Sequence, residues 1–413
     1  MARFLIKLFI FLFIGYTFSH TCYASLATDT VYLTWQRDPS TTMTIQWITP
    51  TSQKHSDIFY RVKQQVTDQW QFASGKAINF PHSRRLCIHS VELVNLQADT
   101  EYNFQIKGEP ESFAFRTAPA DLSKPLCFVT GGDMYHDDIS FMAQTCCQAA
   151  LTNPSFAIIG GDIAYAVGGA YWSFFENNSR WLEWVKTWHA NMITPAGCLI
   201  PVIAAIGNHD LIGQYNQSPR QAAVFSALFP MPGAQIYNAL DFKNYLTFIL
   251  LDSGHANPIS GRQTAWLAQT LSTKSHFLHR FAVYHVPAYP SIRGFYNRHS
   301  QAIREHWVPL FENGKIQAVF EHHDHAFKRS YPLLRNQIDP QGIVYFGDGA
   351  WGVEHPRHPL FKTPRPYLAK FMSIRHFIAV TLNKEQQTFK TITDRGHLVD
   401  EYIIKVIASE PAF

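Results

Sequence analysis

The sequence contains little cysteine, and its cysteines follow no regular spacing. Of six cysteines among 413 residues, Cys22 lies near the N-terminus and the other five are irregularly spaced. This pattern excludes a disulfide-framework domain and a zinc knuckle, and it leaves room for at most one or two disulfide bridges. A hydrophobic core must therefore stabilise the fold, and a chain of this length is long enough to build one.

Charge is also scarce, and neither sign dominates. Charged residues make up 16% of the chain, and the formal net charge is +4. Removal of residues 1–24 would take away two basic residues and no acidic one, which lowers the net charge by two, to +2. A protein that binds nucleic acid electrostatically carries a clustered basic surface. The composition therefore argues against a nucleic-acid partner.

Long apolar runs are missing after the N-terminus. The run at the start covers residues 8–18, follows Arg3 and Lys7, and precedes a pair of small residues. This order is typical of a secretory signal peptide, which we place at residues 1–24. The run is short for a transmembrane helix; an uncleaved anchor is an alternative, and lipidation at Cys22 is a less favoured one. We expect a secreted or periplasmic protein without a stable membrane span.

Residues 25–118 have the pattern of a β-sandwich. Short segments with alternating apolar residues follow one another, and turn formers such as Pro39 and Pro50 separate them. This pattern predicts an all-β module. Trp47 and the sequence LVNLQADTEY around Tyr102 resemble a fibronectin type III domain, after which we expect a linker at 119–125. The predicted strands are 30–36, 43–49, 57–63, 86–96, 101–107 and 111–117.

From residue 126 the pattern changes to continuous apolar segments. They read LCFVTGGD, FAIIGGD, IPVIAAIGNHD, FAVYHVP and IQAVFEHHDH, and helix-like stretches such as 139–153, 180–193 and 261–274 lie between them. Apolar strands joined by long crossovers are buried on both faces. The residues alone predict a layered α/β/α domain over about 126–353. Two or three antiparallel strands at about 370–406 would close the same domain.

Each of the five apolar segments ends in side chains that can bind a metal. Open α/β sheets place their sites outside the carboxyl ends of the strands, so one edge would gather all of these side chains. Taken singly, a Gly-Asp after a strand is usually a turn or a helix cap. Five strand ends that all offer ligand chemistry point instead to one shared site. The residues are Asp133, Asp162, Tyr165, Asn208, His209, Asp210, His285, His323 and His325.

The combined motifs GGD, GGDIAY, GNHD, VYHVP and HHDHAFKRS resemble the calcineurin-like metallophosphoesterases. Within them the chain is similar to the purple acid phosphatases, because Tyr165 in GDIAY stands where that family has its tyrosine. The resemblance implies a two-domain α+β protein. A fibronectin III-like β-sandwich at 25–118 would precede a layered α/β/β/α metallophosphoesterase domain at 126–413.

The resemblance also implies a pair of metal ions. Phenolate and carboxylate ligands suit a hard ferric ion, whereas two imidazoles and an amide suit a divalent zinc, manganese or iron ion. Asp162 would bridge the two ions, about 3.5 to 4 Å apart. By resemblance, the ferric site would use Asp133, Asp162, Tyr165 and His325, and the divalent site would use Asp162, Asn208, His285 and His323.

The implied activity is acid phosphatase chemistry on a small phosphomonoester. A metal-held hydroxide would attack phosphorus in line, and a proton would be delivered to the leaving alkoxide. His209 is the preferred candidate for phosphate contact or proton delivery, with a supporting hydrogen-bond role as the alternative. A phosphodiesterase or nucleotide phosphatase on the same fold is the second reading. The third is an adhesive or binding protein with a vestigial catalytic domain. The sequence predicts no oligomeric state.

Two departures from the family pattern concern the metal centre. The family's first motif is Asp-x-Gly, but here the sequence reads DMYHD. Tyr135 and His136 therefore occupy the place where the family has its glycine. We expect Tyr135 to pack outward, with competition for the metal as the alternative. His322 occupies the glycine position of the Gly-His-x-His motif and follows Glu321. We expect His322 to be an outer-sphere group beside the ions.

Two further departures concern the substrate side. Plant-type enzymes have a pair of histidines where this chain has Gly294 and Phe295. The nearby candidates to hold a phosphate oxygen are Arg293, Tyr296, Arg298 and His299, of which we select His299 as a catalytic candidate. The aromatic insert at 168–181 would form a wall near the site, with a packing loop as an equal alternative.

Overall fold

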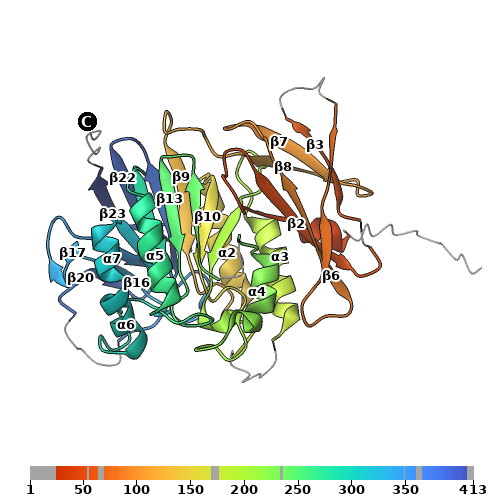
Figure 1. Ribbon diagram of the computed structural model, residues 1–413. Helices are drawn as coiled ribbons and strands as arrows, with labels where there is room; N and C mark the ends of the chain where they lie inside the picture. The colour runs from red at the N-terminus through yellow and green to blue at the C-terminus, as the bar shows by residue number, and fades with distance from the viewer. Residues whose placement is uncertain are drawn as a thin grey trace, which may run out of the picture.

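The computed structural model describes residues 25–406 except 54, 64–68, 169–175, 233–235, 348 and 360–364. The predicted signal peptide and residues 169–175, half of the aromatic insert, lie outside these described residues. No helix within the described part is long and apolar enough to cross a membrane. Figure 1 shows a β-rich N-terminal part beside a larger layered body of strands and helices.

The N-terminal part is a sandwich of two four-stranded antiparallel sheets, which confirms the predicted all-β module. Trp47 is buried in its core and stacks on His89, and the Tyr102 hydroxyl accepts a hydrogen bond from Gln97 N at 2.9 Å. That bond is the corner contact common in such sandwiches. Its elements are α1 (Leu26–Asp29), β1 (Tyr32–Thr34), β2 (Met43–Pro50), β6 (Leu86–Leu93) and β5 (Lys76–Asn79), then β4 (Gln71–Ser74), β3 (Asp57–Val62), β7 (Glu101–Ile106) and β8 (Ser112–Arg116).

Strands β4 and β5 were not predicted from the sequence. Both are short strands at the edges of their sheets, and most of their residues are exposed. An edge strand with little buried area carries only a weak apolar alternation, so its sequence resembles that of a loop. The pairing partners β3 and β6 fix these two strands in the fold.

The larger body contains two sheets packed face to face. The predicted α/β/α arrangement was therefore wrong, and the α/β/β/α arrangement implied by the resemblance is correct. One sheet has the order β11-β10-β9-β21-β22-β23, and the other has the order β12-β13-β14-β15-β19-β16-β20. An apolar strand covered by a second sheet has the same sequence pattern as one covered by helices on both faces, so the strand pattern could not separate the two arrangements.

The first sheet carries the C-terminal strands as its antiparallel edge. Strands β9 and β10 are parallel, and β21 pairs with β9 antiparallel, as the predicted closing strands require. The sheet comprises β9 (Leu126–Gly131), β10 (Phe156–Gly160), β11 (Val202–Ala205), β21 (His376–Leu382), β22 (Gln386–Thr393) and β23 (Leu398–Lys405).

The second sheet is parallel at its centre, so β14 and β15 point their carboxyl ends to the same edge. Its strands are β12 (Asn238–Phe242), β13 (Leu246–Leu250), β14 (His279–Val283), β15 (Ala318–Glu321), β19 (Val344–Gly347), β16 (Phe327–Ser330) and β20 (Leu368–Met372), with a small ribbon of β17 (Leu333–Leu334) and β18 (Gln337–Ile338).

Phenylalanine rings fill the space between the two sheets. The ring centroid of Phe128, on β9, lies 5.2 Å from that of Phe248 and 5.8 Å from that of Phe281, both on the second sheet. A second apolar cluster joins the first sheet to its outer helices, and a third joins the second sheet to its own. The helices on the first sheet are α2 (Ile139–Leu151), α3 (Asn178–Asn191) and α4 (Ala223–Leu228), and those on the second are α5 (Arg262–Thr273), α6 (Arg298–His306) and α7 (Val308–Asn313), with 3₁₀ turns at Asn208–Asp210 and Pro219–Ala222.

Candidate metal centre

The predicted ligands lie on tight turns at the carboxyl ends of the strands. Asp133 follows β9, Asp162 follows β10, and both have positive φ angles, of 55° and 52°. Left-handed backbone is uncommon for residues other than glycine and is concentrated at functional sites. The same conformation occurs at Tyr165, His323 and His325. The fold therefore accepts backbone strain at five of the seven predicted ligands.

Asp133, Tyr165 and His325 form a close, buried trio. The Tyr165 hydroxyl donates to Asp133 Oδ1 at 2.8 Å, and His325 Nε2 lies 2.8 Å from the same oxygen and 2.9 Å from the hydroxyl. Burial, followed by the charge of Asp133, raises the pKa of Tyr165 well above its ordinary value. The tyrosine is therefore a neutral donor until a cation is present. Phenol, carboxylate and imidazole together fit a hard trivalent metal ion.

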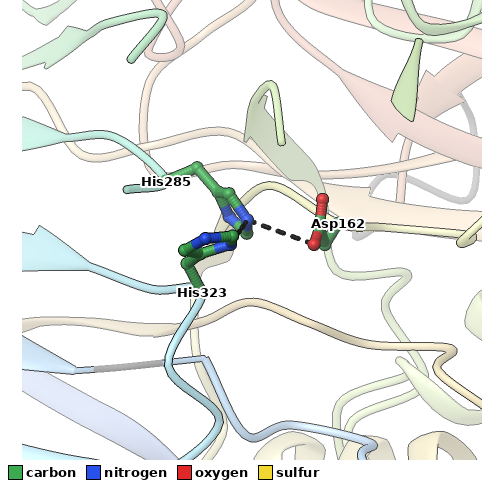
Figure 2. Close-up of side chains that lie close together, drawn as sticks. All are labelled: Asp162, His285 and His323. Carbon is green, nitrogen blue, oxygen red and sulfur yellow. Dashed lines mark hydrogen bonds and ion pairs between the residues drawn. The ribbon is translucent and has the colours of Figure 1, made fainter. Parts of the chain in front are cut away.

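Asp162, Asn208, His285 and His323 form the second group, and Figure 2 shows three of them, Asp162, His285 and His323. His285 Nε2 lies 3.1 Å from Asp162 Oδ2, 3.2 Å from Asn208 Oδ1 and 3.0 Å from His323 Nδ1. One ligand atom from each of Asp162, His285 and His323 lies within 4.8 Å of the others. Donor atoms that converge in this way from separate strand ends fit a divalent cation.

The carboxylates around His285 favour positive charge on its ring. Burial lowers the pKa of His285, but the nearby charges of Asp162 and Asp133 outweigh burial and raise it to about 9. The other ring nitrogen, Nδ1, lies 2.9 Å from the Gly160 carbonyl, which fixes the ring and leaves Nε2 facing the group. A site that holds a proton this firmly is one that a metal cation can occupy instead.

Asp210 supports the centre without joining either group. Its carboxylate accepts from the backbone N–H groups of Asp162 and Ile163, both at 2.8 Å, and of Gly207 at 2.9 Å. These bonds hold the Asp162 turn against the GNHD turn. Asp210 was a candidate from the sequence, and its position explains the motif as a clamp between two ligand-bearing loops.

His209 lies beside both groups. Its backbone N–H donates to Asp162 Oδ1 at 2.7 Å, and its ring stacks on Tyr165 at 4.5 Å between centroids. Its Nδ1 lies 2.6 Å from the Val167 carbonyl, and its Nε2 lies 4.0 Å from Asp162 Oδ2. The side chain keeps about a fifth of its surface exposed, so it can meet a substrate.

The candidates on the substrate side are not gathered in one place. Arg293 Nη1 donates to the His323 carbonyl at 2.7 Å and to Asp324 Oδ1 at 2.6 Å, so its guanidinium braces the histidine turn. Tyr296 is 82% exposed. The His299 ring packs on Tyr215 at 4.6 Å between centroids, one ring removed from the metal ligands. A catalytic role for His299 stays a prediction.

Tyr135 and His136 take different directions. The Tyr135 hydroxyl donates to Glu183, and the Arg180 guanidinium lies 3.7 Å from its ring centroid, so Tyr135 packs against α3 as expected. The centroid of the His136 ring lies 4.8 Å from that of Tyr165, and His136 is partly exposed, which places it at the rim of the group formed by Asp133, Tyr165 and His325.

His322 lies behind the centre, against the glycines that precede the ligands. It is 1% exposed, and a Cβ atom on Gly160 would meet its ring at 1.7 Å. Its ring also borders Gly132 at 2.9 Å from the corresponding Cβ position. Neither ring nitrogen has a hydrogen-bond partner among the described residues. Within the described part of the chain, packing alone therefore holds the imidazole in place.

Sequence reasoning missed Tyr215 and the ion pair beneath the centre. The Tyr215 hydroxyl lies 3.3 Å from both Asn208 Oδ1 and His323 Nε2, yet the surrounding sequence GQYNQ follows no motif. The buried Glu321 carboxylate binds Lys328 Nζ, and it accepts from the Tyr284 hydroxyl at 2.7 Å. The charged residue at position 321, at the end of an otherwise apolar strand, was the only signal of that pair.

Comparison with known proteins identifies both parts of the chain. Residues 28–118 match the purple acid phosphatase N-terminal domain, and residues 132–327 match the calcineurin-like phosphoesterases. Purple acid phosphatase 13 of Arabidopsis thaliana is 25% identical over 306 residues, which cover 64% of this chain and 54% of the relative. Purple acid phosphatase 22 of the same plant is 24% identical over 292 residues, covering 69% and 63%.

These curated relatives are longer than the part they share with this chain, which spans between about half and two thirds of their length. A solved purple acid phosphatase, PPD1 from yellow lupin seeds, superposes with a TM-score of 0.74 at 14% identity, covering 91% of this chain and 74% of that structure. At that identity the superposition establishes the fold. The chain is thus purple acid phosphatase-like: a calcineurin-like phosphoesterase domain at residues 132–327 follows a purple acid phosphatase N-terminal domain at residues 28–118.

Proposed function

We propose that this protein is an exported dimetal acid phosphatase that hydrolyses small phosphomonoesters. The observation that carries the proposal is the convergence of seven predicted ligands into two adjacent buried groups at one edge of the paired sheets. Asp162 is proposed to bridge the two ions, with ferric iron in the group that contains Tyr165 and a divalent ion, zinc, manganese or iron, in the group that contains His285.

Two bound metal ions would supply charge neutralisation for phosphate oxygens and activate water at neutral or acidic pH. The chain's own residues would do the rest. The carboxylates and imidazoles hold fixed positions because buried hydrogen bonds and strained turns orient them. Such preorganisation avoids the cost of rearranging polar groups during the reaction.

His209 is proposed to deliver a proton to the leaving alkoxide. The Val167 carbonyl at 2.6 Å accepts the Nδ1 hydrogen, so the second proton of a charged ring must sit on Nε2. Nε2 is on the side of Asp162, where the phosphate would bind. General acid catalysis of this kind contributes roughly 10²–10⁴-fold to a rate.

Export is proposed from the predicted signal at residues 1–24, and a phosphodiester or nucleotide substrate is the second reading. The segment from Arg293 to His299 lacks the plant-type histidine pair, so the ester specificity need not follow that of the plant enzymes. A comparison of aryl phosphate monoesters with bis-aryl phosphates, at equal metal loading, would separate the readings.

Replacing Tyr165 with phenylalanine tests the proposal. We expect the iron-loaded protein to be coloured by tyrosinate-to-iron charge transfer, to contain two metal ions per chain and to hydrolyse an aryl phosphate. Tyr165→Phe should lose the visible band because it lacks the phenolate, while the exposed Tyr296→Phe should keep it. The measurements are the visible spectrum and the metal content. A colourless iron-loaded protein would refute the purple-type assignment, and a metal-free, inactive protein would favour the vestigial binding protein.

A further inference from the structure

We infer that Tyr215 is a positioning residue for the divalent half of the metal centre, an inference that rests on the proposed function. Its hydroxyl lies 3.3 Å from Asn208 Oδ1 and 3.3 Å from His323 Nε2, which belong to two different ligands of the same proposed ion. One hydroxyl group thus ties together the loop after β11 and the turn after β15.

The direction of these hydrogen bonds follows from the ring of His323. Its Nδ1 lies 3.0 Å from His285 Nε2, so Nδ1 is the atom that faces the group of ligands. A nitrogen that binds a metal ion carries no hydrogen, and the ring hydrogen must then sit on Nε2. Nε2 points at the Tyr215 oxygen, which accepts that hydrogen.

The same hydroxyl has one hydrogen of its own to donate. Asn208 Oδ1 is within reach and can accept it, and the second lone pair of that oxygen would remain available to a bound ion. The resulting chain runs from His323 to Tyr215 to Asn208, and each bond has only one possible direction. Outer-sphere partners of this kind fix the tautomer and the orientation of ligating groups and raise metal affinity.

The protein holds Tyr215 in place from behind. Its ring packs between the rings of His255 at 4.9 Å and His299 at 4.6 Å, measured between centroids. Backbone bonds from Asn216 N to the Gly254 carbonyl at 3.0 Å and from Gln217 N to the His255 carbonyl at 2.7 Å attach the Tyr215 loop to the neighbouring segment.

That neighbouring segment is itself fixed by a buried carboxylate. Asp252 accepts from His255 N at 2.8 Å and from Ala256 N at 2.9 Å. The Tyr215 loop and the segment around His255 are therefore bonded to each other. These backbone bonds fix the position of the Tyr215 hydroxyl without any contact with the ligands. This rigidity is what a group that orients a metal ligand needs.

Tyr215→Phe tests the inference because it removes the hydroxyl and keeps the ring that packs on His255 and His299. The probe is Zn²⁺ alone, titrated into full-length protein that already holds ferric iron, with Kd measured by chelator competition. We expect the Kd for Zn²⁺ to rise by about ten- to a hundredfold. The visible band of Tyr165 should persist, and saturating Zn²⁺ should restore kcat. Tyr296→Phe, at an exposed tyrosine, is the matched control.

The possible outcomes separate the inference from the proposed function. An unchanged Kd in Tyr215→Phe overturns the inference, and a kcat that stays low at saturating Zn²⁺ would place Tyr215 on the substrate instead. Wild-type protein that binds none of Zn²⁺, Mn²⁺ and Fe²⁺ refutes the proposed function. Thermal denaturation of each variant checks the fold, since a loss of affinity together with a large fall in Tm would indicate a structural role only.

Discussion

Replacing Asp162 with asparagine is expected to lower kcat by more than about a hundredfold, the upper end of what outer-sphere changes cause. The two carboxylate oxygens have different tasks: Oδ1 accepts the His209 N–H at 2.7 Å, and Oδ2 faces His285 Nε2 at 3.1 Å. An asparagine amide keeps only one of these two oxygens. Its NH₂ group would face either the His209 N–H, which is also a donor, or a metal ion, which an NH₂ group cannot bind well. Both proposed ions should therefore bind poorly.

The comparison with two other ligand variants decides whether Asp162 is a bridge. Asn208→Ala and His285→Ala each remove one ligand of the divalent ion, so each should retain the ferric ion and its visible band. Asp162→Asn should lose metal from both positions, as measured by metal content per chain. Asp241→Asn, at a carboxylate paired with Lys274 away from the centre, is the control. Equal activity losses with full metal occupancy in all three ligand variants would rule out the bridging role.

The sequence predicted that the candidate ligands gather at one place because each of them follows the end of a strand. Asp133 and Asp162 follow buried apolar runs, and parallel strands must bring their carboxyl ends to one edge. Tyr165 lies three residues after Asp162, so its place depends on a local turn. In these cases the local sequence determines where a residue lies in the fold, so a sequence pattern is enough to predict its position.

The residues that sequence reasoning missed depend on contacts between loops. Tyr215 reaches His323 across 108 positions of sequence, and no local pattern records that contact. Its position is set by backbone bonds to the segment around Gly254, and a loop can make such bonds with almost any side chains. For the same reason the sequence left Arg293, Tyr296, Arg298 and His299 as alternative candidates to hold a phosphate oxygen.

A second limit of the sequence concerns what covers a strand. Phe128, Phe248 and Phe281 meet between two sheets, but each lies in an apolar run that helices could equally have covered. Only the resemblance to a known family indicated the second sheet. His322 shows the same limit. The sequence predicted that its imidazole lies near the ions, but it could not predict that the ring fills the space beside Gly160 and Gly132.

Gly160→Ala is expected to destabilise the protein, and His322→Gly in the same chain is expected to relieve much of that effect. The added Cβ would lie 1.7 Å from Cδ2 and 1.8 Å from Nε2 of the His322 ring. Overpacking of this kind costs about 1–3 kcal/mol or more. Gly132 also borders this ring, because a Cβ atom added to it would lie 2.9 Å from Nδ1. Urea unfolding of the single and double variants measures the coupling.

His322→Gly alone is expected to cost about 2–5 kcal/mol because it empties a buried ring position. Burial also lowers the pKa of His322 to about 3, so the ring is neutral at ordinary pH and no buried charge is lost with it. The double variant should therefore be more stable than the sum of the single effects predicts, by at least about 1 kcal/mol. Gly294→Ala, where a Cβ would meet no neighbouring atom, should change stability by less than about 0.5 kcal/mol.

Metal content provides the second readout of the same variants. Because the His322 ring makes no hydrogen bond within the described chain, and glycine keeps the backbone N–H that donates to the His285 carbonyl, folded His322→Gly should keep both ions. His323→Ala and His325→Ala should each lose one. Additive losses in the double variant would mean that Gly160 and His322 do not share the same space. Loss of an ion from His322→Gly together with retention in His323→Ala would assign the ligand role to His322 instead of His323, and the turn after β15 would then have a different register at the site.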